Sequence, residues 1–336
     1  MKTMEPGYIA LYRSGELERR VRALEARLRS CDICPRKCGV NRWENETGFC
    51  HSAYLPMVAA ICAHHGEEPA ISGHRGSGTI FFSNCNMRCV YCQNHQISQN
   101  YRAQITKQID FHILAERMLY LQNELGCHNI NFVSPSHFIP QMLRAVLEAV
   151  PMGLTLPLVY NTSSYYSVES LTELDGIVDV YLADLRYASN KWGKKLSKVS
   201  DYVEQAHAAI KEMYRQVGDL VMDDNGIARK GLIVRHLILP NGLAGSRESL
   251  TWLVKEVSPS VTVSIMSQYY PAHRAGQMPL LARKITPQEY DEVVGLLDEL
   301  GIENGWIQEM GASESYVPDF SRDGHPFEPV IKSETI

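Results

Sequence analysis

Three cysteines stand close together in the sequence, with three and then two residues between them: Cys85, Cys89 and Cys92. Three thiolates are one ligand short of a closed tetrahedral zinc site. They are also one short of the four thiolates that hold an ordinary ferredoxin-type cluster. On a [4Fe–4S] cluster they would leave one iron open to a substrate or cofactor, which suits catalysis better than electron storage. A chance triple of thiols or a zinc knuckle is the alternative.

A second group of four cysteines lies within twenty residues near the N-terminus. Its members are Cys31, Cys34, Cys38 and Cys50. Four thiolates suit a structural zinc, a rubredoxin-type iron or a second cluster. We favour zinc slightly, because a second cluster would need a further reason for electron transfer. Free thiols or a disulfide are the alternative.

The composition is that of a soluble globular protein. The chain has 336 residues, of which 45% are hydrophobic and 21% charged, enough for one large α/β domain with an appended segment. The net charge of −5 gives no sign of a nucleic-acid or acidic-membrane partner. The apolar runs are too short to cross a bilayer, and the first ten residues lack a signal core. We therefore expect a cytoplasmic protein, in which thiols stay reduced.

From residue 78 onward, short apolar runs alternate with longer helical patterns. Strands are expected at Thr79–Ser83, Asn129–Val133, Leu156–Asn161, Val178–Ala183, Leu232–Leu239 and Val261–Met266. Helices are expected at Phe111–Leu125, Ile139–Ala149, Val168–Leu174, Lys198–Val217, Ser246–Val257 and Pro287–Leu300. A hairpin is expected over 218–230, and a last strand near 305–309. The alternation predicts a parallel sheet with helical crossovers, as a barrel or a doubly wound sheet. Either fold gathers ligands at the carboxyl ends of the strands, where the three cysteines follow the first strand.

The spacing Cys-x3-Cys-x2-Cys, with Tyr91 before the last cysteine, resembles the signature of the radical S-adenosylmethionine (SAM) superfamily. The resemblance implies an α/β fold, a partial (β/α)6 barrel, that carries a [4Fe–4S] cluster and SAM. In that superfamily SAM binds at the open iron. One electron then cleaves it to methionine and a 5′-deoxyadenosyl radical, which abstracts hydrogen from a substrate.

Two stretches narrow the resemblance. Residues 76–83, with Cys92-Gln93-Asn94, look like the activating-enzyme branch, which includes the anaerobic oxidoreductase pyruvate formate-lyase activating enzyme. Residues 31–42 with Gly48-Phe49-Cys50 are similar to its homologues of unassigned role. The resemblance implies a protein backbone glycine as the leading substrate and a flavodoxin- or ferredoxin-type electron donor. The alternatives are radical modification of a small metabolite or peptide, and an iron–sulfur or zinc binding protein without turnover.

The resemblance also implies contacts to SAM. Tyr91 is expected against the adenine. The branch usually carries a Gly-Gly-Glu-Pro-type motif for the SAM amine, and this chain has Ser134 and Ser136 at that place instead. A near match at residues 66–69, Gly-Glu-Glu-Pro, precedes the cysteines, and we interpret it as unrelated to the site.

Further contacts are implied at later strand ends. Asn161 and Ser163 stand where the family holds the ribose. Asp184-Leu185-Arg186 resembles the family's Asp-Leu-Lys, with Arg186 as the cation for the methionine carboxylate. Arg235, on the fifth strand, is a further candidate. A structural ion pair is the alternative for Asp184 and Arg235.

Polar aromatic residues after the sixth strand are candidates for the substrate cavity, namely Gln268, Tyr269 and His273. An ordinary aromatic loop at the barrel mouth is the alternative. The expected organisation is an N-terminal helix with a Cys-rich metal-binding module over residues 1–75, a radical SAM partial barrel over 76–310, and a C-terminal tail over 311–336.

Overall fold

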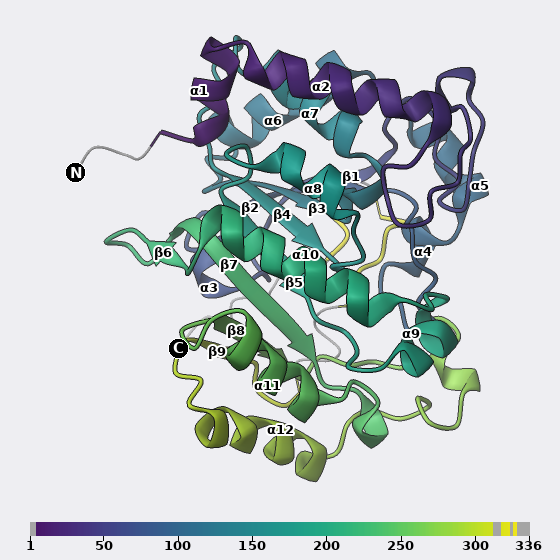
Figure 1. The fold of residues 1–336 in the computed structure, drawn as a ribbon, viewed down its shortest axis with the longest axis vertical. Coiled ribbons are helices and arrows are strands. Elements are labelled where there is room, and N and C mark those ends of the chain that lie inside the picture. The colour runs from purple at the N-terminus through teal and green to yellow at the C-terminus, as the bar shows by residue number, and fades with distance from the viewer. Residues whose placement is uncertain (1–4, 312–316, 323–324, 328–336) are drawn as a thin grey trace.

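The structure is a computed structural model that describes residues 5–311, 317–322 and 325–327 (Figure 1). The rest of the expected C-terminal tail lies outside the described residues. The predicted parallel sheet is confirmed, and its parallel strands follow one another in chain order. They are β2 (Ser77–Phe82), β3 (Ile130–Val133), β4 (Leu158–Thr162), β5 (Val180–Asp184), β7 (Ala228–Leu237), β8 (Thr262–Met266) and β9 (Gly305–Ile307).

Two antiparallel strands complete the sheet. β6 (Val221–Met222) forms the predicted hairpin with β7. β1 (Val58–His64), which was not predicted, pairs with β2, so the expected boundary after residue 75 falls between two paired strands. In the order β1-β2-β3-β4-β5-β7-β8-β9, the described strands form an open sheet with β1 and β9 at its two edges. The fold class is therefore mixed α/β with a mainly parallel sheet.

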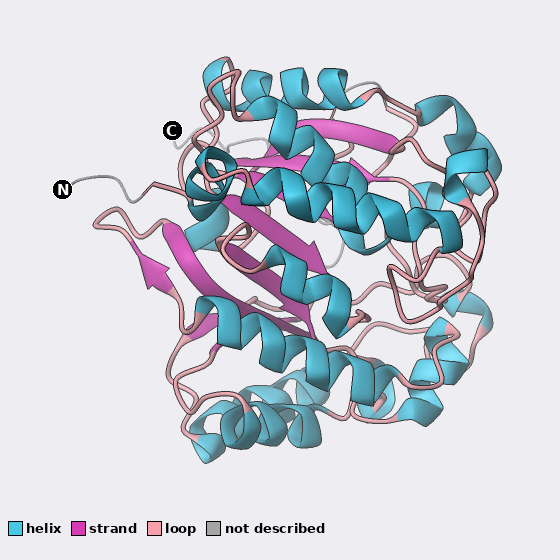
Figure 2. Cartoon of the chain, turned by 45° about the horizontal axis from the view of Figure 1, so that its top comes forward, coloured by secondary structure: helices cyan, strands magenta, loops and turns pink. Residues whose placement is uncertain are grey.

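The crossover helices pack on one face of the sheet (Figures 1 and 2). Strand residues such as Phe132, Tyr160 and Tyr181 are fully buried in the core that these helices share. None of the described helices has the length and apolar composition that crossing a membrane requires. The crossover helices are α6 (Phe111–Asn123), α7 (Ile139–Ala149), α8 (Val168–Leu171), α10 (Tyr202–Val217), α11 (Ser246–Glu256) and α12 (Pro287–Leu300).

The largest difference from the predicted helix boundaries is at the start of α10. The helix expected from Lys198 starts only at Tyr202, as α10, and a further helix, α9 (Asn190–Ser197), precedes it. Lys198 has a left-handed backbone with φ of 56°, which ends α9 and reverses the chain. Apolar periodicity does not register such a break, because the polar link resembles the exposed side of a helix.

The opposite face, which we call the inner face, is closed at one end by the short helix α3 (Pro69–Ser72). β1 runs antiparallel to β2 and places His64 opposite Ser77, the first residue of β2. The chain therefore enters α3 at the amino ends of the parallel strands. There Ala70 and Ile71 pack on inner-face residues that include Val159, Val180, Leu182 and Ile233.

The N-terminal helices α1 (Gly7–Arg13) and α2 (Glu16–Ala26) lead to the first cysteine group, and α2 packs on α7. A buried arginine, Arg42, connects the segment after α2 to the sheet through hydrogen bonds. Arg42 is 1% exposed, and its Nε and Nη2 atoms donate to the carbonyl of Ala53 at 3.0 and 2.8 Å. Its Nη1 atom donates to the carbonyl of His137, just after β3, at 2.7 Å.

We predict that Arg42→Ala lowers the free energy of unfolding by about 2–4 kcal/mol, because two buried carbonyls lose their donors. Chemical denaturation measures this change. The matched control is Arg22→Ala on α2, whose exposed ion pair with Glu18 should contribute less than about 1 kcal/mol. Equal losses in the two variants would contradict the anchoring role of Arg42.

Candidate functional site

The loop that carries Cys85, Cys89 and Cys92, which we call the cysteine loop (residues 85–92), joins β2 to α4 (His95–Ser98). Asn84 begins the turn with φ of 67° and donates to the carbonyl of His51 at 3.1 Å. Farther along, the amides of Arg88 and Val90 donate to carbonyls at the end of α9, at 3.0 and 2.8 Å. The N-terminal segment and α9 thus hold the loop from two sides.

The three thiols line one cavity of about 420 Å³ on the inner face. Each sulfur lies near a hydrogen-bonding group, which is what a metal-bound thiolate requires. The neighbours are the Met87 amide at 3.4 Å from Cys85, the Ser197 hydroxyl at 3.0 Å from Cys89, and the Ser98 hydroxyl at 3.2 Å from Cys92.

The three thiols share one wall of the cavity. Burial raises the pKa of Cys85, and it raises that of Cys92 to about 12, so a bound metal would stabilise the thiolates. A [4Fe–4S] cluster distributes its thiolates over separate irons, so thiols that share a wall fit it.

The first cysteine group lines a second, much smaller cavity of about 10 Å³, together with Arg42 and His137. Burial raises the pKa of Cys31, and it raises that of Cys34 to about 12. All nine cysteines lie within the described residues, and none forms a disulfide. The structure brings Cys31, Cys34, Cys38 and Cys50 together around this small cavity.

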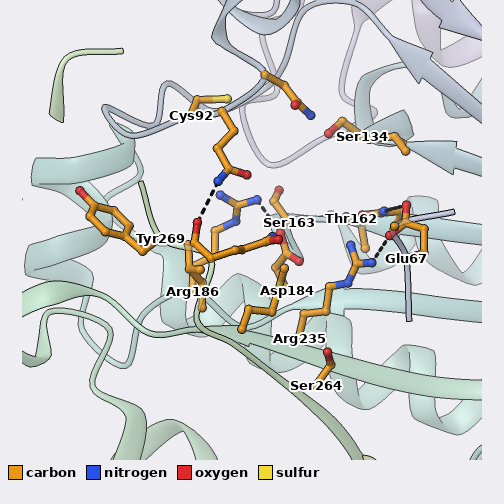
Figure 3. Close-up of a pocket in the computed structure, with 18 of the residues that line it drawn as sticks. Glu67, Cys92, Ser134, Thr162, Ser163, Asp184, Arg186, Arg235, Ser264 and Tyr269 are labelled. Atoms are coloured by element: carbon orange, nitrogen blue, oxygen red, sulfur yellow. Dashed lines mark hydrogen bonds and ion pairs between the residues drawn. The ribbon is translucent and has the colours of Figure 1, made fainter. Parts of the chain in front are cut away.

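Most of the residues expected to contact SAM line the large cavity. Strand register explains the grouping, because Asp184 on β5 pairs with Arg235 on β7, which pairs with Ser264 on β8. The exception is Ser136, which is buried outside the lining, 3.4 Å from the hydroxyl of Thr162. The expected contacts that do line the cavity, several of them shown in Figure 3, are Tyr91, Ser134, Asn161, Ser163, Asp184, Arg186 and Arg235.

Two of the three expected substrate residues reach the cavity. Gln268 and Tyr269 line it, and the Gln268 carbonyl accepts a hydrogen bond from Gln93 at 3.1 Å. His273 does not belong to the lining but stacks on His95, with ring centroids 4.8 Å apart. Its left-handed backbone, with φ of 52°, turns the chain so that the ring packs on α4 instead.

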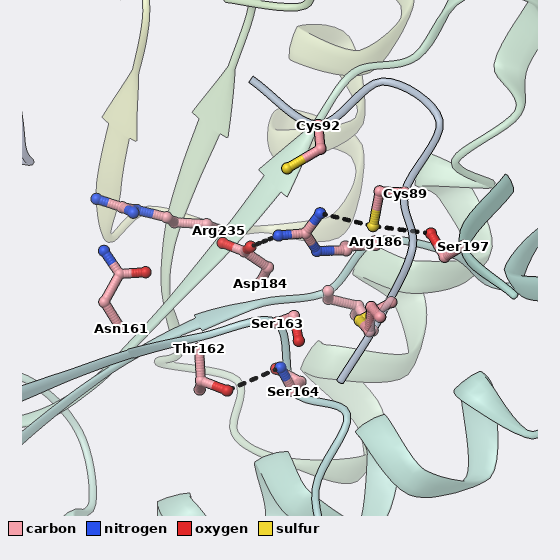
Figure 4. Close-up of polar contacts among 12 residues, drawn as sticks. Cys89, Cys92, Asn161, Thr162, Ser163, Ser164, Asp184, Arg186, Ser197 and Arg235 are labelled. Carbon is pink, nitrogen blue, oxygen red and sulfur yellow. Dashed lines mark hydrogen bonds and ion pairs between the residues drawn. The ribbon is translucent and has the colours of Figure 1, made fainter. Parts of the chain in front are cut away.

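Arg186 lies beside the cysteine loop, as Figure 4 shows. Its Nη2 atom is 2.5 Å from Asp184 and its Nη1 atom 3.7 Å from the Cys89 sulfur. Burial opposes the charge, but attraction to Asp184 and Cys89 outweighs it and holds the pKa of Arg186 well above its ordinary value. The buried Nε–H has no hydrogen-bond partner among the described residues. A charged group therefore lines the cavity next to the thiols.

Tyr91 is connected to Cys89 by a chain of hydroxyl groups that the sequence did not reveal. Its phenol oxygen is 2.5 Å from that of Tyr187, which is 2.7 Å from the hydroxyl of Ser197. Ser197 in turn donates to the Cys89 sulfur. Burial raises the pKa of Tyr91, so the phenol stays protonated. This chain fixes the Tyr91 ring in the cavity wall.

The sequence interpretation of residues 66–69 as unrelated to the site is wrong, because all four line the cavity. Glu68 holds Arg235 in a two-point ion pair, with N–O distances of 2.7 and 2.6 Å. Glu67 contacts the same guanidinium through Oε2, and its Oε1 accepts from Asn131 at 3.0 Å and Asn161 at 3.4 Å. Asp184 and Arg235 both form ion pairs, although not with each other. Asp184 pairs with Arg186, and Arg235 pairs with Glu67 and Glu68.

Comparison with known proteins finds a relative by sequence and similar solved structures. No protein-family model matches the chain. Two solved structures are similar: HydG, a maturase of the [FeFe]-hydrogenase, and SuiB from Streptococcus suis. Their TM-scores are 0.49 and 0.45, their identities 11% and 10%, and the alignments cover 71% and 68% of this chain. The chain spans about half of each, 53% and 48%, and at these scores neither likeness supports a statement about fold or function.

The sequence relative is the uncharacterized protein MJ0674 of Methanocaldococcus jannaschii. The two chains are 30% identical over 283 residues, which cover 82% of this chain and 76% of the relative. The aligned residues include most of the strands around the cavity, even if all the unaligned residues of this chain lie at one end. The chain therefore belongs to the same protein family as MJ0674.

Proposed function

We propose that the protein is a radical SAM enzyme that holds a [4Fe–4S] cluster through Cys85, Cys89 and Cys92 and binds SAM beside it. The observation that carries the proposal is the placement of three thiols with this spacing after the first parallel strand. They line a cavity into which polar side chains from three later strands, β4, β5 and β7, also project. When bound, such a cluster supplies the electron that cleaves SAM, so that hydrogen can be abstracted from a substrate.

The chain's own residues have separate roles in this proposal. The hydroxyl of Ser197 and the amide of Met87 donate to sulfurs and favour the thiolate state. Arg186 lines the cavity and offers its positive charge to the SAM carboxylate. Asn161 and Ser163 hold the ribose, and Tyr91 presents its ring to the adenine.

Two substrate classes fit the proposal. The sequence resemblance to activating enzymes supports a protein backbone glycine, converted to a glycyl radical. The inner end of the cavity supports a small metabolite or a peptide side chain, because α3 and the buried Glu67–Arg235 group bound the cavity there. Both need a flavodoxin- or ferredoxin-type donor and a reducing compartment such as the cytoplasm. A binding protein without turnover would take up the cluster but leave SAM intact.

The test of the proposal is anaerobic reconstitution, followed by measurement of the cluster absorbance and of 5′-deoxyadenosine. Replacing Cys85, Cys89 or Cys92 with Ala should abolish both signals, because three thiolates are the minimum set for an open-iron cluster. Cys127→Ala, at a lone buried cysteine on the other face, is the matched control and should keep both. A full cluster in the triple variant would assign the iron to other ligands.

A second prediction concerns the affinity for SAM. Arg186→Ala should leave cluster assembly intact and weaken SAM binding by about 1.5–3 kcal/mol, the usual contribution of one hydrogen bond to a charged group. Arg186→Lys should recover part of the loss, because an ammonium still acts as a point charge. Anaerobic calorimetry measures both variants. Unchanged SAM affinity in the alanine variant would show that Arg186 serves only as the partner of Asp184.

A third prediction concerns the first cysteine group, which we propose binds one structural metal, zinc rather than iron. Replacing Cys31, Cys34, Cys38 and Cys50 with Ala should lower the melting temperature and leave the cluster spectrum unchanged. The physical reason is that a structural metal contributes folding free energy directly. Elemental analysis of anaerobically purified protein measures the metal. Finding no metal beyond the cluster iron would refute the proposal.

A further inference from the structure

The inner end of the cavity is bounded by Glu67, Glu68 and Arg235, and we call these three residues the cavity floor. Their side chains are 8%, 5% and 10% exposed. They belong to the loop that enters α3 and to the inner face of β7, whereas the thiols belong to the cysteine loop. Figure 3 shows Glu67 and Cys92 apart, on different sides of the cavity.

The charges around the cavity do not balance. Among the described residues, three carboxylates line it, those of Glu67, Glu68 and Asp184, against two guanidinium groups, those of Arg186 and Arg235. Glu68 engages two nitrogens of Arg235, and Asp184 engages Arg186. Glu67 must share Arg235 with Glu68, so one negative charge at the floor lacks a cation of its own.

Protonation does not remove this charge. Burial works to raise the pKa of Glu67, but attraction to Arg235 and to His64 and hydrogen bonds from Arg235 and Asn131 outweigh it, and the pKa lies below its ordinary value. Burial lowers the pKa of the neighbouring His64 although the charge of Glu67 works to raise it, so His64 compensates little of this charge at neutral pH. The excess negative charge therefore persists in a site that is largely withdrawn from water, where an unmatched charge is costly.

A further residue fixes the orientation of Glu67. Asn131 is fully buried on the inner face and does not line the cavity, and its amide nitrogen donates to Glu67. Trp306, next to Ser264 across the sheet, adds an aromatic face to the same lining, which favours a cation.

We propose that the cavity floor binds a cationic nitrogen of the substrate, so that the substrate is an amine or guanidine compound, or a peptide side chain of that kind. The inference rests on the proposed function, because it takes the thiol side of the cavity as the place of SAM. Glu67 supplies the unmatched charge, and the substrate's N–H groups donate to its carboxylate. The aliphatic part of the substrate then extends from the floor toward the cysteine loop, where its C–H bonds are available for abstraction.

SAM carries an ammonium group of its own, which could occupy the floor instead. The geometry favours the substrate, because Arg186, our candidate for the SAM carboxylate, lies 3.7 Å from the Cys89 sulfur. The amino and carboxylate groups of SAM share one carbon atom, so both belong on the thiol side. The two sources of the cation are separated by measuring amine binding and SAM binding independently.

The experiment uses n-butylammonium as the probe, with n-butanol and n-butyrate as neutral and anionic analogues. Fluorescence of Trp306, with Trp306→Phe as the blank for the other tryptophans, reports binding to the unreconstituted protein. The ammonium should bind at least about tenfold more tightly than the alcohol, and Glu67→Gln should remove that preference. The matched control is Glu25→Gln, at a buried glutamate paired with Arg144 outside the cavity, which should leave the preference intact.

Each other outcome has a definite meaning. Equal binding of butylammonium and butanol to the unmodified protein overturns the proposal without reference to any variant. A Glu67→Gln protein that keeps the preference for the ammonium also overturns it. If the reconstituted Glu67→Gln protein instead loses SAM affinity tenfold or more, the floor holds the SAM ammonium and the substrate inference is wrong. Failure of the proposed function can be distinguished from failure of this inference. In that case the unmodified protein would bind the amine but form no 5′-deoxyadenosine.

Discussion

Arg235 contacts Glu67 and Glu68 across the inner face, and 168 and 167 residues of sequence separate the partners. Three charged groups withdrawn from water are stable only while they remain together, because removing one leaves another uncompensated. This constraint joins β7 to the loop that enters α3. It fixes the position of residues 66–69, which bound the inner end of the cavity. Our proposals for SAM and for the substrate both depend on where that end lies.

The cavity combines two chemical environments. On one side, sulfur atoms receive hydrogen bonds from hydroxyl groups and an amide, an environment suited to a soft metal cluster. On the other side, carboxylates accept hydrogen bonds from arginine and asparagine. Asp184 and Arg186 lie between the two environments, and strand register places Asp184 next to Arg235. A ligand that spans the cavity must therefore be polar at both ends.

The repeating part of the fold could be predicted from the sequence, and so could several residues that line the cavity. Strands such as Val180–Asp184 consist mainly of a continuous apolar run, and polar residues such as Asp184 appear where the run stops. These polar residues are therefore predicted at the carboxyl edge of the sheet. β1 and Glu67 could not be predicted in the same way. Whether a short apolar run is a strand depends on a partner, and the antiparallel turn after His64 returns residues 66–69 to the inner face. Asn131, a polar residue within an apolar strand, was the available signal that something polar lay opposite.

The pairing of β1 with β2 also bears on how the protein can be shortened. In this sheet β1 occupies the edge and covers the backbone donors and acceptors along one side of β2. A fragment that begins after residue 75 would present β2 as an open edge, with the apolar side chains of Phe81 and Phe82 close by. Exposed edges of this kind recruit other strands, so such a fragment would aggregate rather than form an independent barrel. The first cysteine group and the sheet are therefore one unit for expression and crystallisation.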